Sequence, residues 1–70
     1  MPFLDVVVAK YDYQAQDPVE LSMKEGELFL VLDKCDSDWW NATSVSSHQT
    51  GQIPSNFVDR VNLTPILHSD

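Results

Sequence analysis

The sequence has very few of the residues that form covalent cross-links or metal centres. It contains one cysteine, Cys35, and two histidines, His48 and His68, in 70 residues. A lone cysteine cannot form an intramolecular disulfide, and structural zinc sites take several Cys and His ligands from one chain. We therefore expect no metal and no cofactor. A domain that folds by packing alone also suits a reducing compartment, so we expect it in the cytoplasm.

Basic residues are also scarce. The chain has 4 Lys and Arg against 11 Asp and Glu, which gives a formal net charge of −7. This charge repels phosphate backbones and anionic lipid, so neither nucleic acid nor a membrane surface is an expected partner. No apolar run approaches the roughly 18–20 residues that span a bilayer. The start Met1–Asp5 lacks the basic residues of a signal peptide. A basic partner is favoured instead.

Long helical patterns are absent, and the apolar stretches are short and rich in β-branched and aromatic residues, as strands are. We expect about five strands, a common number for one sheet system. They are Val6–Ala9, Leu28–Leu32, Trp39–Thr43, Gln52–Pro54 and Phe57–Val61. The segment Pro54–Asn56 favours a short 3₁₀ turn, because proline lacks the N–H that a strand ladder needs.

Short strands bury one face each when the sheet folds on itself, as a small barrel or two orthogonal sheets. The predicted fold is therefore all-β. The two-residue period of strands predicts a core. It consists of Val7, Ala9, Leu21, Met23, Phe29, Val31, Ala42, Ile53 and Val58. We expect a domain over residues 6–61, an N-terminal extension over 1–5 and a C-terminal tail or linker over 62–70.

Several aromatic residues do not fit into this core. Tyr11 and Tyr13 share a face at the start of a long irregular segment, residues 11–24, and loops of that length are usually functional. Trp39 and Trp40 are adjacent, so in a strand they point to opposite faces. Together with Phe57 they indicate an exposed aromatic patch for binding.

Four segments carry a resemblance to a known family. Ala9–Tyr13 resembles the ALYDY motif of Src homology 3 (SH3) domains, and Glu20–Glu27 resembles their ELSF segment with its following KKGE. Asp38–Trp40 resembles their DWW, and Gly51–Val58 resembles GYIPSNYV. The order and spacing fit over nearly the whole chain. The resemblance implies a small five-stranded SH3-like barrel with two orthogonal sheets and a short 3₁₀ turn. It also implies a non-catalytic adaptor function.

The resemblance also implies the binding site. The family's groove for proline-rich PxxP segments maps onto Tyr11, Tyr13, Trp39, Pro54, Asn56 and Phe57. Acidic residues for a flanking Arg or Lys of the ligand map onto Asp17, Glu20, Asp36 and Asp38. Arg should be preferred over Lys because its fork can bond a carboxylate bidentately. We expect a monomeric domain of a larger signalling, cytoskeletal or endocytic protein, able to bind peptides in either chain direction.

Two positions depart from the family pattern. Lys10 replaces the leucine of ALYDY, and we expect its side chain to face outward. Phe57 replaces the usual groove tyrosine and removes one hydroxyl. A phenylalanine at this position also occurs in SH3 domains that bind ubiquitin, so a folded protein surface such as ubiquitin is the alternative ligand.

Other classes of function are less well supported by the sequence. An enzyme would need a nucleophile with a base, or a metal cluster, and no such set accompanies the carboxylates. A nucleic-acid-binding barrel could stack bases on the exposed aromatics but would need a basic groove. A purely structural or dimerising module remains open at this stage.

Overall fold

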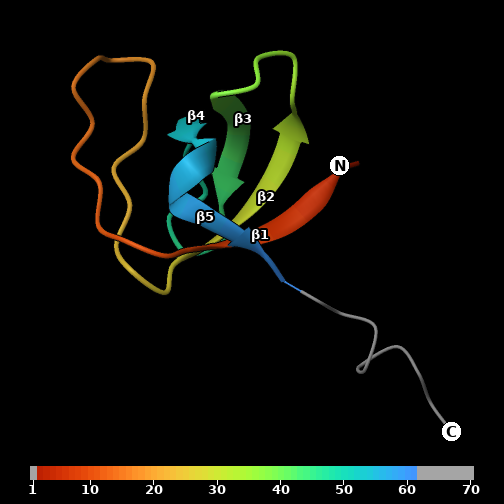
Figure 1. Ribbon diagram of the computed structural model, residues 1–70, viewed down its shortest axis with the longest axis horizontal. Coiled ribbons are helices and arrows are strands. Elements are labelled where there is room, and N and C mark those ends of the chain that lie inside the picture. Colours follow the sequence, from red (N-terminus) through yellow and green to blue (C-terminus); the bar gives the residue numbers. More distant parts are fainter. Residues whose placement is uncertain (1, 62–70) are drawn as a thin grey trace, which may run out of the picture.

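The computed structural model of the chain describes residues 2–61. The described residues form five strands and one short 3₁₀ turn and contain no α-helix; Figure 1 shows how these elements are arranged. The elements are β1 (Asp5–Ala9), β2 (Leu28–Asp33), β3 (Trp39–Ser44), β4 (Thr50–Pro54), the 3₁₀ helix η1 (Ser55–Phe57) and β5 (Val58–Arg60). The predicted all-β class, the number of strands and the presence of a 3₁₀ turn are confirmed. The turn lies one residue later than predicted, so Phe57 belongs to η1 and not to the last strand. In residues 2–61 there is no helix with the length and apolar character needed to cross a membrane.

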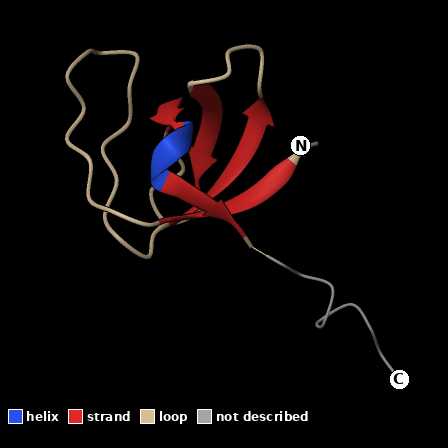
Figure 2. Cartoon of the chain, viewed as in Figure 1, coloured by secondary structure: helices blue, strands red, loops and turns tan. Residues whose placement is uncertain are grey.

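The strands form one antiparallel sheet in the order β4-β3-β2-β1-β5. Neighbours in the chain are neighbours in the sheet, except that β5 returns to pair with the far edge of β1. The two sheets expected from the sequence are therefore joined by a continuous hydrogen-bond ladder through β2 and β1. The register of β2 against β3 shifts between Val31 and Asp33, and such a bulge bends a strand and increases its twist. Figure 2 shows the strands gathered together and the longest loop extending away from them.

The core contains the side chains that the strand period places inward. The buried hydrophobic cluster consists of Val7, Ala9, Met23, Phe29, Val31, Ala42, Ile53 and Val58, and all of them were predicted. Leu21, the remaining predicted core residue, is only partly buried and packs against this cluster. It does not lie in a strand of the sheet but covers the core from the long loop. Trp40 also packs against the core, while Trp39 points the other way, as the strand alternation predicts.

One polar residue, Ser44, is buried at the end of β3. Its hydroxyl donates to Glu27 Oε2 at 2.7 Å and accepts the backbone N–H of Ser47 at 3.2 Å. Across residues 2–61, every buried side-chain nitrogen or oxygen has a hydrogen-bond partner. The hydroxyl therefore anchors the turn between β3 and β4 to the residue before β2 without a desolvation penalty.

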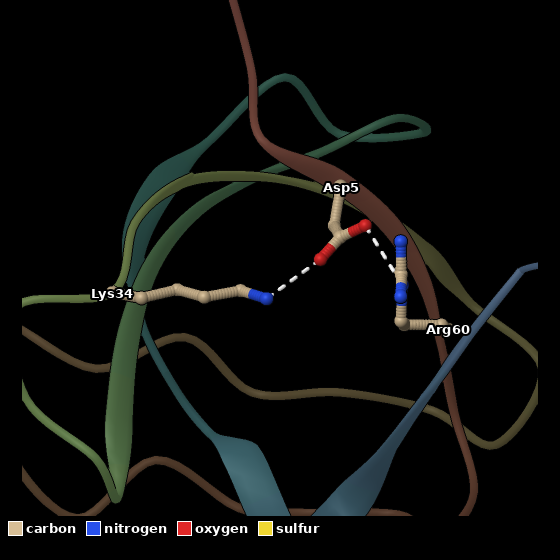
Figure 3. Close-up of polar contacts among 3 residues, drawn as sticks. All are labelled: Asp5, Lys34 and Arg60. Carbon is tan, nitrogen blue, oxygen red and sulfur yellow. Dashed lines mark hydrogen bonds and ion pairs between the residues drawn. The ribbon is translucent and has the colours of Figure 1, made fainter.

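A charged cluster joins three distant segments outside the core. Figure 3 shows Asp5, at the start of β1, between Lys34 and Arg60. Asp5 Oδ2 accepts from Lys34 Nζ at 2.6 Å, and Oδ1 accepts from Arg60 Nε at 3.0 Å. The side chain of Asp5 is only 12% exposed. The hydrogen bond from Lys34, and to a smaller degree the charge of Arg60, lower the pKa of Asp5 below its ordinary value of 3.8.

Replacing Asp5 with Asn should lower the free energy of unfolding at neutral pH by about 1–2 kcal/mol, since two charge-assisted hydrogen bonds are weakened. Because the pKa of Asp5 is lowered on folding, its contribution is present above the unfolded value of 3.8 and is lost as the pH falls below it. Urea unfolding at pH 7 and at pH 3 measures this. The difference in the free energy of unfolding between wild type and Asp5→Asn should be smaller at pH 3 than at pH 7. An equal difference at both pH values would contradict this role of Asp5.

Candidate functional site

The long loop between β1 and β2 comprises residues 10–27, and we call it the arm (Figure 1, orange to yellow). Its two halves are joined by backbone hydrogen bonds in both directions between Tyr13 and Met23, at 2.9 and 2.8 Å. Gly26 turns the chain into β2 with a positive φ of 89°. Glycine adopts this left-handed conformation without steric cost.

The second half of the arm is hydrogen-bonded to the edge strand β4. The N–H of Leu21 donates to the carbonyl of Gln52, and the N–H of Gln52 donates to the carbonyl of Val19, both at 2.8 Å. These two bonds flank Glu20, so its backbone is fixed against the sheet. Gly51 permits this approach, because a Cβ there would lie 2.9 Å from the carbonyl oxygen of Val19.

Four aromatic rings form a continuous row on the surface beside the arm. Tyr11 meets Phe57 with ring centroids 5.5 Å apart, and Phe57 meets Tyr13 at 5.6 Å. Tyr13 in turn meets Trp39 at 6.0 Å. All three pairs are edge-to-face, an arrangement that aromatic rings favour. Tyr11, at one end of the row, is 55% exposed.

The remaining groove positions belong to the segment that follows β4. Pro54 is buried and lies opposite Trp39 in the register of β3 and β4. Asn56 is exposed in η1. Ser55 holds η1 against the loop before β3, since its N–H donates to the carbonyl of Asp38 at 2.9 Å and its hydroxyl to that of Ser37 at 2.8 Å. All six predicted groove residues thus lie on the arm, at the β3–β4 end or in η1.

Glu20 lies next to the aromatic row. Its Oε1 accepts the hydroxyl of Tyr13 at 2.6 Å and the backbone N–H of Gln16 at 2.9 Å. The hydrogen bond to Glu20 raises the pKa of Tyr13 above its ordinary value of 10.0. Tyr13 therefore stays a neutral donor at physiological pH, and the carboxylate is bonded directly to a ring of the row.

A pocket of about 200 Å³ lies at the Trp39 end of the row. Its lining residues are Asp33, Cys35, Asp36, Trp39, Asn41 and Gln52. Two carboxylates and two amides around an aromatic ring suit a cation with hydrogen-bond donors. Because Gln52 is bridged to the backbone of Glu20, the pocket adjoins the arm as well.

Of the four acidic residues expected at the site, one lines the pocket. Asp36 lines the pocket, and its Oδ1 accepts the N–H of Asp38 at 2.8 Å and that of Trp39 at 3.3 Å. Asp17 is exposed on the arm, where its Oδ1 accepts the N–H of Val19 at 3.1 Å. Neither Asp17 nor Asp38 lines the pocket.

Four pocket residues were not among the site residues expected from the sequence: Asp33, Cys35, Asn41 and Gln52. Asn41 follows Trp39 by two positions in one strand, so the strand period alone would have placed it on the same face. Gln52 lies opposite Asn41 in the register of β3 and β4. Asp33 depends on the bulge in β2, which pairs it with Asn41 and which no local pattern signals.

Cys35 is exposed at the pocket, next to the carboxylate of Asp33. A hydrogen bond to Asp33 and the negative charge of that carboxylate raise the pKa of the Cys35 thiol above its ordinary value of 9.0. The thiolate is the reactive form. We therefore expect iodoacetamide at pH 8 to modify Cys35 more slowly than free cysteine, and Asp33→Asn to increase the rate. Mass spectrometry of timed samples measures both, and equal rates in the two variants would contradict this role of Asp33.

In the comparison with known families, residues 8–55 match the family model described as SH3 domain. The match covers more than half of the 70 residues. It includes the whole arm, the pocket and three of the four rings of the row, while Phe57 lies just beyond it.

Proposed function

The chain belongs to the SH3 domain family, whose members are non-catalytic modules that bind proline-rich segments, and we propose that its row of aromatic rings is the binding groove. The groove comprises Tyr11, Tyr13, Trp39, Pro54, Asn56 and Phe57. The contact of four rings in one row carries the proposal.

The chemistry of a proline-rich ligand fits this surface. A polyproline II segment has about three residues per turn and no internal hydrogen bonds, so its carbonyls are free. Proline rings fill slots between aromatic ridges, while the Trp39 indole N–H and the Asn56 amide can donate to the carbonyls. Little conformational entropy is lost, and a small groove then yields micromolar affinity, roughly −8 kcal/mol.

Acidic residues at one end of the groove supply a preference for a basic residue in the ligand. Glu20 and Asp36 are bonded to Tyr13 and to the backbone of Trp39, respectively, and Asp17 and Asp38 lie in the same two loops. The net charge of −7 attracts a basic segment from a distance. The proposed ligand is therefore a PxxP segment with a flanking Arg or Lys.

We assign no catalytic step to this surface. Residues 2–61 hold no group of three or more His, Cys, Asp or Glu side chains placed to bind a metal ion. The proposed activity is tethering: a monomeric module of a larger cytoplasmic protein raises the effective concentration of its neighbours near a proline-rich partner.

An ¹⁵N-NMR titration tests the proposal. The ligands are PxxP peptides of both orientations, each with and without a flanking Arg. We expect the indole N–H of Trp39, the amides around Glu20 and the side-chain amide of Asn56 to shift, with tighter binding of the Arg peptides. A folded domain whose groove signals do not move at millimolar peptide would reject the proposal.

Phe57 favours a second candidate ligand, a folded protein surface such as ubiquitin. Its ring lies between those of Tyr11 and Tyr13 and offers no hydroxyl to a peptide carbonyl. A ring without a hydroxyl group at the centre of the row suits an apolar protein surface. Titration with ubiquitin tests this, and Phe57→Tyr should weaken such binding while retaining that of peptides. Absence of shifts around Phe57 would eliminate this ligand.

A further inference from the structure

One oxygen of the Glu20 carboxylate is used by the protein itself. Oε1 accepts the hydroxyl of Tyr13 and the N–H of Gln16, at 2.6 and 2.9 Å. A carboxylate oxygen has about two lone-pair sites, so these two donors saturate Oε1. Within residues 2–61, no hydrogen bond reaches Oε2. The carboxylate therefore offers one oxygen to a ligand.

The carboxylate cannot easily turn to offer both oxygens. The backbone on either side of Glu20 is bonded to Gln52, and the N–H of Glu20 donates to the carbonyl of Asp17 at 3.0 Å. Tyr13 is held in turn by two backbone bonds to Met23 and by its contacts with two rings of the row. Releasing Oε1 would leave the Tyr13 hydroxyl and the Gln16 amide without their acceptor.

The same arrangement recurs at three other carboxylates around the groove. Asp36 Oδ1 accepts two backbone N–H groups, and Asp17 Oδ1 accepts that of Val19. Asp33 Oδ1 accepts the N–H of Cys35 at 2.8 Å. Asp17, Asp33 and Asp36 thus each have one oxygen engaged by their own loop, so none of these three supplies a free pair of oxygens in place of Glu20.

From this geometry we propose that Glu20 binds the cation of the ligand through Oε2 alone, and that Tyr13 is the positioning residue that holds Oε1. The proposal rests on the proposed function and refines its specificity. A bidentate arginine fork needs both carboxylate oxygens. With one oxygen available, arginine loses that advantage over the compact ammonium group of lysine. The domain should therefore accept Lys and Arg ligands almost equally, unlike the arginine preference that the sequence alone predicts.

The test compares two PxxP peptides that differ only in a flanking Arg or Lys. Dissociation constants are measured by NMR or calorimetry for wild type, Tyr13→Phe and Tyr11→Phe. In wild type the two constants should agree within about threefold. Tyr13→Phe frees one lone pair of Oε1 for the fork, so the preference for Arg should rise to about tenfold. Tyr11→Phe removes a hydroxyl that has no bond to Glu20, and it should keep the wild-type ratio.

Two results would overturn the proposal: a strong Arg preference in wild type, or a ratio that Tyr13→Phe leaves unchanged. If Tyr13→Phe does not fold, Glu20→Gln decides instead. It should weaken the binding of the Arg and Lys peptides by the same factor, whereas a larger loss of affinity for the Arg peptide would indicate a bidentate fork. If neither peptide binds folded wild type, the proline-rich function itself fails, and the proposal with it. That result is distinguishable from a wrong ratio.

Discussion

Glu20→Lys is expected to lower the affinity for an Arg-flanked PxxP peptide by about 100-fold, equivalent to about 3 kcal/mol, while the domain stays folded. The substitution removes the charge-assisted bond to the ligand and places a positive charge where the ligand carries one. Glu20 is only half-buried, and the bonds of Val19 and Leu21 to Gln52, which hold its backbone, do not involve its side chain. Calorimetric titration measures the affinity, and thermal unfolding monitors the fold.

Glu20→Gln is the matched control. A glutamine oxygen can still accept from Tyr13 and Gln16, so the aromatic row keeps its support while the charge is lost. We expect an intermediate affinity for the Arg-flanked peptide, and no change for a peptide that lacks a basic residue. Equal affinity of wild type and Glu20→Lys for the Arg-flanked peptide would remove Glu20 from the site.

The core and the strands could be predicted because their signals are local. The two-residue alternation of Val7 with Ala9 and of Phe29 with Val31 depends only on the geometry of one strand. The same argument separates Trp39 from Trp40. Leu21 has the right character for the core, but its burial depends on how the arm folds over β4, which no local pattern shows.

The site could be predicted only in part, because it depends on contacts between segments far apart in the sequence. The sequence has more aromatic residues than the core can hold, which identifies them as site candidates. Their order in the row, however, is set by the arm, β3 and η1 together. The bond from Tyr13 to Glu20 and the inclusion of Asp33 in the pocket have no local signature. The first depends on the fold of the arm and the second on the bulge in β2.

Gly51→Ala should destabilise the domain and displace the arm, although alanine adds only one methyl group. The new Cβ would lie 2.9 Å from the carbonyl oxygen of Val19, a backbone atom that cannot rotate away. That oxygen also accepts the N–H of Gln52, so moving it breaks one of the bonds that flank Glu20. Overpacking of this kind costs about 1–3 kcal/mol. Domains of this size have only about 3–5 kcal/mol of stability from their core, so urea unfolding will detect the loss readily.

The displacement of the arm should also weaken ligand binding. As the arm lifts from β4, Glu20 moves relative to Trp39, and we expect affinity for an Arg-flanked peptide to fall by about tenfold. Gly26→Ala is the matched comparison: no atom lies within 4 Å of its Cβ position, but its φ of 89° strains an alanine, at a cost of about 1–2 kcal/mol. Both variants lose stability, but only Gly51→Ala should shift the amides of residues 19–21 and of Gln52. If the two variants bind the peptide equally well, the contact between the arm and β4 does not position Glu20, and the groove depends on the sheet alone.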